Sequence, residues 1–150
     1  MLRLANQDEL ELVYRIVQTT IAEIYPHYYP KGAVEFFQEH HSKPHIAADI
    51  ENHAVYLLYD GECPVATLTI NDNEINRLFV LPAHQHRGYG TQLMDFAETE
   101  IAMHHPQAIL CASHAAQEMY CKRGYTVDQF WKIPCHYGDF LCYFTMKKAL

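Results

Sequence analysis

The sequence predicts an α/β fold in one domain, residues 1–150, in which seven strands alternate with four helices. The main observation is that hydrophobic residues recur at helical spacing in some segments and alternate in others, with turn residues between them. Composition agrees, because 49% of the residues are hydrophobic and 19% are charged, which excludes a disordered chain. No apolar run approaches the roughly 18–20 residues of a membrane helix, and no signal peptide is recognisable. We therefore expect a cytoplasmic protein with no membrane partner.

The first third of the chain predicts one short strand and two helices. Residues 2–5 form the strand, and Asn6 with Glu9 has the spacing of a capping box. The helix that follows is expected to end near Pro26, and a second, shorter helix from residue 31 is expected to end at Pro44. The apolar face of this second helix is formed by Val34 and Phe37 and is continued by His41.

The middle third predicts an antiparallel meander. Residues 53–59 alternate and are rich in Val, Tyr and Leu, and Asp60-Gly61 after them is a strong hairpin signal. Two further strand-like runs, 65–70 and 74–81, are separated by the turn sequence Asn71-Asp72-Asn73.

The last third returns to helical spacing and then ends in strands. A helix that begins after Pro82 is stopped by Pro106, and Gly124 is placed to end a second helix in the left-handed conformation. The remaining elements are a strand over 108–112, that second helix over 114–123, and strands over 125–133 and 140–146.

The charge balance and the cysteines limit the function classes. Eleven Lys and Arg against 18 Asp and Glu give a net charge of −7, which argues against a nucleic-acid partner and suits a cationic substrate. The five cysteines are an odd number without a CxxC pair, so we expect reduced thiols. Cys111 lies in a predicted strand and is expected to be buried.

A strand, a short loop with two glycines and a helix start follow one another over residues 78–91. The unpaired N–H groups and positive dipole of a helix start bind phosphate, and Gly88 and Gly90 let an anion approach the backbone. Alternatively, the two glycines only make a tight turn. No Lys-Ser/Thr pair follows them, and Leu93 stands where a dinucleotide fingerprint has its third glycine.

The same segment resembles a known family. Residues 85–90 (Q-x-x-G-x-G) are similar to the Q/R-x-x-G-x-G/A motif of the GNAT superfamily of N-acetyltransferases, and 78–82 resembles the strand before it. Residues 116–125 are similar to its A-x-x-x-Y-x-x-x-G-F/Y segment, and 143–148 to its last strand. The likeness is strongest over 74–125 and only architectural before residue 53. It implies a mixed, mostly antiparallel central sheet of about seven strands, flanked by four helices.

The resemblance also implies that acetyl-CoA is the acetyl donor. In the family, the loop and the first helical turn bind the pyrophosphate, and main-chain groups of the fourth strand bind the pantetheine arm and polarise the thioester carbonyl. Ser113 stands where many members carry an Asn that contacts CoA, and it is kept as a cofactor contact. The implied donor site therefore comprises Leu78, Phe79, Val80, Gln85, His86, Arg87, Gly88, Tyr89, Gly90, Thr91, Ser113 and Tyr120.

Two residues are candidates for catalysis. Tyr120 matches the family's general acid, which protonates the departing CoA thiolate, although it could simply pack on its helix face. Glu74 lies where some members place a base, but a water relay could serve instead, and a solvated Glu at a turn is the plain alternative. In a regular strand Glu74 shares a face with Leu78 and Val80, and a bulge would change that parity.

The family's acceptor pocket is formed mainly by the first two helices and the last hairpin. The residues that match are aromatic or His side chains, each of which could instead belong to the core or the surface: Tyr28, Tyr29, Phe37, His41 and Tyr137. No His, Cys and carboxylate set has metal-site spacing, so no metal is expected.

The sequence therefore predicts an acyl-CoA-dependent N-acetyltransferase. An amine, favoured as part of a small molecule, attacks the thioester directly in a ternary complex. A protein N-terminus or lysine as acceptor, and a catalytically silent CoA-binding sensor or interaction module, remain alternatives. Homodimers are common among members of the family.

Overall fold

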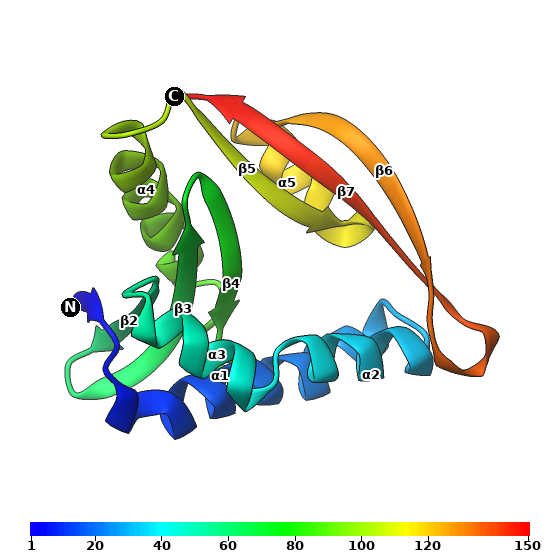
Figure 1. Cartoon of the computed structure of the whole chain (residues 1–150), viewed down its shortest axis with the longest axis horizontal. Coiled ribbons are helices and arrows are strands. Elements are labelled where there is room, and N and C mark those ends of the chain that lie inside the picture. Colours follow the sequence, from blue (N-terminus) through cyan, green and yellow to red (C-terminus); the bar gives the residue numbers. More distant parts are fainter.

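The computed structural model describes residues 1–150 and places seven strands in one sheet, in the order β1-β2-β3-β4-β5-β7-β6 (Figure 1). All neighbouring strands are antiparallel except β4 and β5, which are parallel. The predicted fold class is confirmed. The strands are β1 (Leu2–Leu4), β2 (Val55–Asp60), β3 (Cys63–Asn71), β4 (Glu74–Val80), β5 (Gln107–Ser113), β6 (Thr126–Pro134) and β7 (Phe140–Ala149).

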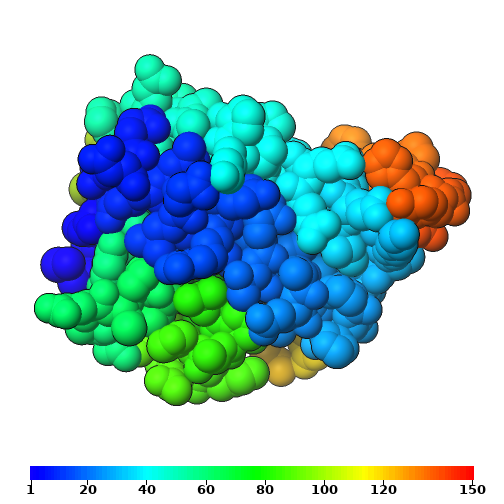
Figure 2. All heavy atoms as spheres, turned by 90° about the horizontal axis from the view of Figure 1, so that it is seen from below, coloured from blue at the N-terminus to red at the C-terminus, as the bar shows by residue number.

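Helices cover the two faces of the sheet unequally. α1 (Leu10–Ile24), α2 (Lys31–His40) and α3 (Lys43–Glu51) lie below the sheet in Figure 1, and α4 (Tyr89–Ala102) and α5 (His114–Lys122) lie on its other face. Figure 2 shows the first three helices, in blue to cyan, covering most of the lower side. The orange tip of the β6–β7 hairpin stands out beyond them. No helix combines the length and hydrophobicity needed to cross a bilayer.

Most of the predicted boundaries rest on local signals that the structure confirms. Asn6 and Glu9 form the capping box, although the first turn is a 3-10 helix and α1 begins only at Leu10. Gly61 has φ +60° in the β2–β3 turn, and Gly124 has φ +98° just after α5.

The prediction that Pro44 ends the second helix is wrong. That helix stops at His40, and Pro44 lies in the first turn of a further helix, α3, which the sequence reading missed. Proline is accepted there because the first N–H groups of a helix have no partner within it.

The hydrophobic core has two parts, one on each face of the sheet. One packs α4 against the sheet through Leu93, Ala97 and Ile101, with Tyr120 of α5 at its margin. The other packs α1 and α3 against it through residues such as Val17, Ile21 and Ile46. On β5, Cys111 lies between the buried residues Leu110 and Ala112 and is directed to the opposite face of the sheet, so its side chain is exposed and not buried as expected.

A bulge in β4 reverses the direction of its side chains. Asn76 pairs with Thr69 and Phe79 with Thr67, so two residues of β4, Arg77 and Leu78, lie opposite one of β3. Arg77 has φ +43°, and Phe79 is buried among α1 and α3.

β4 and β5 are joined over a very short length. They pair only at Glu74 with Ile109 and at Ile75 with Leu110, and Figure 1 shows them diverging beyond this point. The edge of β4 that follows is therefore free of strand partners on the β5 side.

Candidate functional site

The free edge of β4 borders a cavity of about 670 Å³. The cavity is formed by that strand, the loop after it, the start of α4 and the end of α5. Of the residues predicted for the donor site, the structure brings ten to its wall: Leu78, Phe79, Val80, Gln85, His86, Gly88, Tyr89, Gly90, Thr91 and Tyr120.

The backbone of β4 turns hydrogen-bonding groups toward this cavity. The N–H of Leu81 donates to Val65 on β3 at 2.9 Å. Because successive residues of a strand direct their main-chain groups to opposite edges, Leu78 and Val80 direct theirs to the free edge. The Val80 carbonyl accepts a hydrogen bond from Gln85 Nε2 at 3.1 Å. The edge can therefore pair with an extended ligand as with a further strand.

The loop after β4 ends in an uncapped helix start. Gly88 precedes α4 with φ +84°, and no side chain caps the first turn of that helix. Its N–H groups and dipole therefore remain available to an anion. Gly90 has no positive φ, and no protein atom lies within 4 Å of where its Cβ would stand. The turn explains Gly88, whereas nothing in the protein itself requires a glycine at 90.

Tyr120 lies on α5, with its ring edge-on to Tyr125 at 5.9 Å. Burial raises the pKa of Tyr120, so its hydroxyl stays protonated at neutral pH. Tyr25, at the end of α1, also lines the cavity, and burial followed by Tyr29 and Tyr120 raises its pKa. Tyr120 and Tyr25 thus both bring a neutral tyrosine O–H group to the cavity wall, which also contains Tyr89.

Glu74 lies outside the cavity wall. It pairs with Asn71, and the bulge leaves it on the face of Phe79 and not on the face of Leu78 and Val80. Its carboxylate is near Cys111 and adds to the effect of burial in raising the pKa of that thiol. It has no ion-pair or hydrogen-bond partner.

Two further predicted donor residues also lie elsewhere. The Ser113 hydroxyl caps α5 by accepting a hydrogen bond from the N–H of Ala116 at 3.1 Å. Arg87 is exposed and is not part of the cavity wall.

The predicted acceptor residues divide into a half-buried group and a surface group. Phe37 packs between the rings of Tyr29, at 5.1 Å, and His41, at 6.5 Å. His41 Nδ1 accepts a hydrogen bond from Arg77 Nε at 3.1 Å, and burial followed by Arg77 lowers its pKa to about 3. Tyr28 is exposed. The structure therefore gives His41 a partner within the protein.

The fifth predicted acceptor residue, Tyr137, joins the β6–β7 hairpin to α2. Its hydroxyl donates to Glu35 at 3.0 Å. Nearby, the N–H of Gly32 donates to the Asp139 carboxylate at 2.8 Å, and a Cβ on Gly32 would stand 2.2 Å from the His136 carbonyl oxygen. The hairpin tip is thus held against the start of α2.

Sequence reasoning missed several residues of the cavity wall. Thr20 was detectable as a polar residue on the apolar stripe of α1, and it is buried. Arg123, paired with Glu98 at 2.7 Å, and Lys122 are cations just before the predicted helix end at Gly124. The full set is Thr20, Ile24, His84, Met94, Met119, Lys122 and Arg123.

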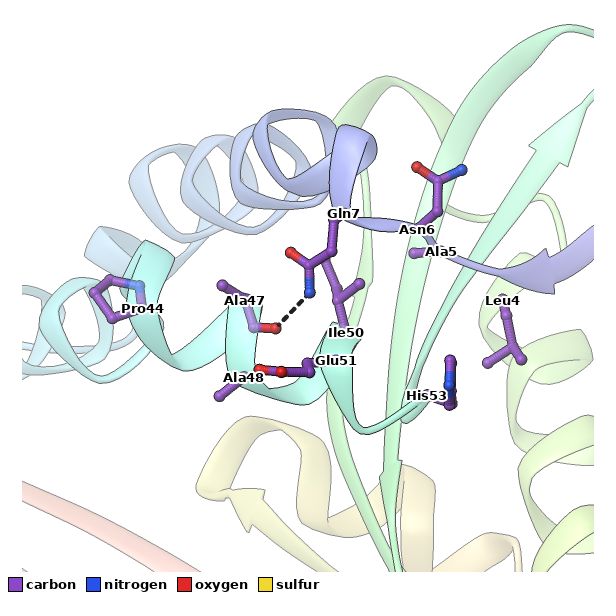
Figure 3. A pocket seen from close by; sticks show the side chains of 10 residues that line it. All are labelled: Leu4, Ala5, Asn6, Gln7, Pro44, Ala47, Ala48, Ile50, Glu51 and His53. Carbon is purple, nitrogen blue, oxygen red and sulfur yellow. Dashed lines mark hydrogen bonds between the residues drawn. The ribbon is translucent and has the colours of Figure 1, made fainter.

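A second hollow, of about 900 Å³, lies between the β1–α1 connection and α3 (Figure 3). Gln7 bridges it by donating to the Ala47 carbonyl at 3.1 Å. Its wall contains none of the predicted site residues, and Glu51 and His53 are its only titratable side chains. The cavity beside β4 is therefore the candidate site.

Comparisons with solved structures find the same fold. A GCN5-related N-acetyltransferase from Rhodopseudomonas palustris is 24% identical, with a TM-score of 0.89 over 100% of this chain and 95% of that one. The PaiA N-acetyltransferase of Thermoplasma acidophilum, solved with coenzyme A, is 19% identical, with a TM-score of 0.76 over 100% and 98%. The ribosomal-protein-S18-alanine N-acetyltransferase of Escherichia coli is 16% identical, with a TM-score of 0.73 over 99% and 92%.

A search of curated protein sequences finds no match. The sequence model of a family described as acetyltransferase (GNAT) domain matches residues 24–150, which include the whole strand edge, loop and tyrosine just described. The chain therefore belongs to the GNAT family of acetyltransferases.

Proposed function

We propose that this protein transfers an acetyl group from acetyl-CoA to a primary amine. The observation that carries the proposal is that one cavity brings together a free strand edge, an uncapped helix start and a protonated tyrosine. Each suits one part of an acyl-CoA: the pantetheine arm, the pyrophosphate and the leaving sulfur. The solved PaiA structure with coenzyme A has the same fold, which supports this reading.

The donor lies with its pyrophosphate at the first turn of α4 and its pantetheine arm along β4. Gly90 leaves room for the phosphates, and Lys122 adds positive charge in the cavity wall. The main-chain N–H of Leu78, at the free edge, donates to the thioester carbonyl and stabilises the oxyanion that forms there.

The reaction is direct attack in a ternary complex. The amine nitrogen bonds to the carbonyl carbon, and the C–S bond breaks as the tetrahedral intermediate collapses. An aliphatic amine has a pKa of ~10.4, so only about one molecule in a thousand or fewer is neutral at pH 7. Glu74, directly or through water, takes the proton of the ammonium group before the attack, and the Tyr120 hydroxyl protonates the departing thiolate. The second proton, which the nitrogen loses as the amide forms, passes through water and restores the Tyr120 hydroxyl.

The acceptor approaches from the face of the sheet opposite α5, where Glu74 and Cys111 lie. We favour a small amine, because α2 and the hairpin tip narrow the approach on this face. Two hydrogen bonds hold them together, one from Gly32 to Asp139 and one from Tyr137 to Glu35. The alternatives are a protein N-terminus or lysine as acceptor, and CoA binding without catalysis. The experiments below distinguish these alternatives from acetylation of a small amine.

The first test is thermal unfolding with acetyl-CoA, with ATP and NAD as controls. A ligand at 100 times its Kd adds about 2.7 kcal/mol, which raises the Tm of a domain of this size by roughly 5–10 °C. A selective rise identifies the donor, and no rise with millimolar acetyl-CoA contradicts the proposal. Release of CoA thiol with a panel of small amines and with peptides then separates the acceptor classes. Binding without release from any acceptor supports a silent module.

A further inference from the structure

A buried arginine lies in the bulge of β4 and reaches two helices. The side chain of Arg77 is only 9% exposed. Its Nε donates to His41 Nδ1, at the end of α2, at 3.1 Å. Its Nη1 is ion-paired with the Asp49 carboxylate of α3 and lies 3.4 Å from the Thr69 hydroxyl. One guanidinium thus joins β4 to β3, α2 and α3.

The backbone of Arg77 needs this support. Its φ of +43° is in the left-handed region, which L-residues other than Gly rarely adopt and which stores strain unless the surroundings hold it. The guanidinium contacts offset this cost, because each is made to a group within a helix or strand or, for His41, directly at the end of one. A bulge without them would favour a return to regular pairing.

The next residue is the one whose main-chain N–H faces the donor. Leu78 shares the bulge with Arg77, and alternation counted back from the Leu81–Val65 hydrogen bond directs its main-chain groups to the free edge of β4. A regular strand would turn Leu78 to the other edge, because the removal of one residue from the register reverses every later direction. The conformation of Arg77 therefore sets the direction of the Leu78 N–H.

We propose that Arg77 is a positioning residue for acetyl transfer, which acts by holding the bulge so that the Leu78 N–H points at the thioester carbonyl of the donor. This inference rests on the proposed function, because it assumes that acetyl-CoA occupies the cavity. Arg77 does not touch the donor, since it is absent from the cavity wall and its guanidinium lies on the α2–α3 side of the sheet.

The test reads the thioester carbonyl directly. Acetyl-CoA labelled with ¹³C at the carbonyl is bound to the wild type, to Arg77→Met and to Arg77→Lys, and its resonance is compared with that of free acetyl-CoA. We expect a shift on binding to the wild type that Arg77→Met loses, with acetyl-CoA affinity changed by less than about threefold. With the best amine of the panel, kcat should fall about 10–100-fold while KM for acetyl-CoA changes little.

Two variants separate this role from a loss of stability. Arg3→Met removes a more exposed arginine of β1, which is paired with Glu9 at 2.6 Å. Because β1 is far along the sheet order from β4, this variant should lower Tm without moving the resonance. Arg77→Gly loses the guanidinium contacts as Arg77→Met does but accepts the positive φ without strain, so its bulge needs no support and it should keep the shift.

The outcomes distinguish this inference from the proposed function. If the wild type does not bind acetyl-CoA, both are overturned. If the wild type binds acetyl-CoA but Arg77→Met keeps the wild-type carbonyl resonance and kcat, or Arg77→Gly loses the shift as fully as Arg77→Met, the positioning role alone is overturned. If Tm falls in Arg77→Met but the carbonyl resonance does not change, the positioning role is also overturned, because Arg77 then contributes only to stability.

Discussion

Ile75 and Phe79 lie four residues apart on one strand, yet their side chains are buried on opposite faces of the sheet. In a regular strand they would share a face. The bulge between them has a consequence for the site, because Leu78 and Val80 pack on the donor side while Glu74 lies on the other. In the proposed reaction, acetyl-CoA and the Glu74 carboxylate would then approach the thioester carbon from opposite faces of the sheet.

Glu74→Gln should lower kcat without weakening acetyl-CoA binding. The amide keeps the shape of the side chain but cannot take a proton, and loss of a general base costs about 10²–10⁴ in rate. Steady-state kinetics with the best amine, together with acetyl-CoA titration, measure both quantities. Glu62→Gln, an exposed glutamate in the β2–β3 turn, is the matched control and should leave both unchanged. An unchanged kcat in Glu74→Gln would leave a water relay as the base.

Tyr120→Phe should reduce kcat by about 100-fold, because the CoA thiolate then departs without a proton donor. Phe preserves the ring that packs edge-on against Tyr125, so Tm and acetyl-CoA affinity should change little. Single-turnover release of CoA thiol checks the effect on the chemical step. If kcat is unaffected while Tm falls, Tyr120 is a packing residue only.

Gly90→Ala should separate binding from folding. Its Cβ meets no protein atom within 4 Å and its φ is not positive, so the substitution should stabilise the free protein by about 0.4–1 kcal/mol. A ligand phosphate against the first turn of α4 would meet that methyl group, and acetyl-CoA affinity should fall about tenfold or more. Thermal unfolding with and without acetyl-CoA measures both effects.

Gly88→Ala is the contrasting variant. At φ +84° the new side chain is strained, and we expect a loss of about 1–2 kcal/mol of stability even without ligand. If Gly90→Ala instead binds acetyl-CoA as tightly as the wild type, the two glycines serve only the turn.

His41 should make the fold sensitive to mild acid. Its pKa is lowered to about 3 in the folded protein, whereas in the unfolded chain it is ~6.5. Between these values the unfolded state binds a proton that the native state does not, so stability falls as pH falls. At pH 5 this contributes about 2 kcal/mol, from ~1.4 kcal/mol for each pH unit.

Urea unfolding of wild type and His41→Gln at pH 7 and pH 5 tests this. The wild type should lose more stability on going to pH 5 than the variant does, and by up to that amount. Equal losses would mean that the His41 ring accepts a proton in the folded protein despite its contact with Arg77.

The elements that sequence reasoning predicted well are those fixed by local chemistry. The Asn6–Glu9 box and the glycines at 61 and 124 act within a few residues, and their effect can be read without knowledge of the fold. The helix α3 was missed because proline both ends helices and begins them, and only the chain around Pro44 decides which.

The candidate site was predictable where one continuous segment of backbone forms it. Residues 85–91 form one loop and the helix start that follows it, and all of them except Arg87 line the cavity. Side chains that act across elements were not predictable. Thr20 and Ile24 reach the cavity from α1, and His41 is hydrogen-bonded to Arg77, which lies on a strand 36 residues later. Such pairs depend on the packing of helices on the sheet, which periodicity does not specify.

The two-residue pairing between β4 and β5 gives a bound donor a structural role. Without ligand, one half of the sheet (β1–β4) pairs with the other half (β5, β7 and β6) only at Glu74 and Ile75 of β4. In the proposed binding mode, the pantetheine arm of an acyl-CoA lies along β4, in the gap between the two halves of the sheet, and contacts both. Residues from both halves form the proposed acceptor surface, so bound acyl-CoA would complete that surface. This favours an order of binding in which the donor enters before the amine.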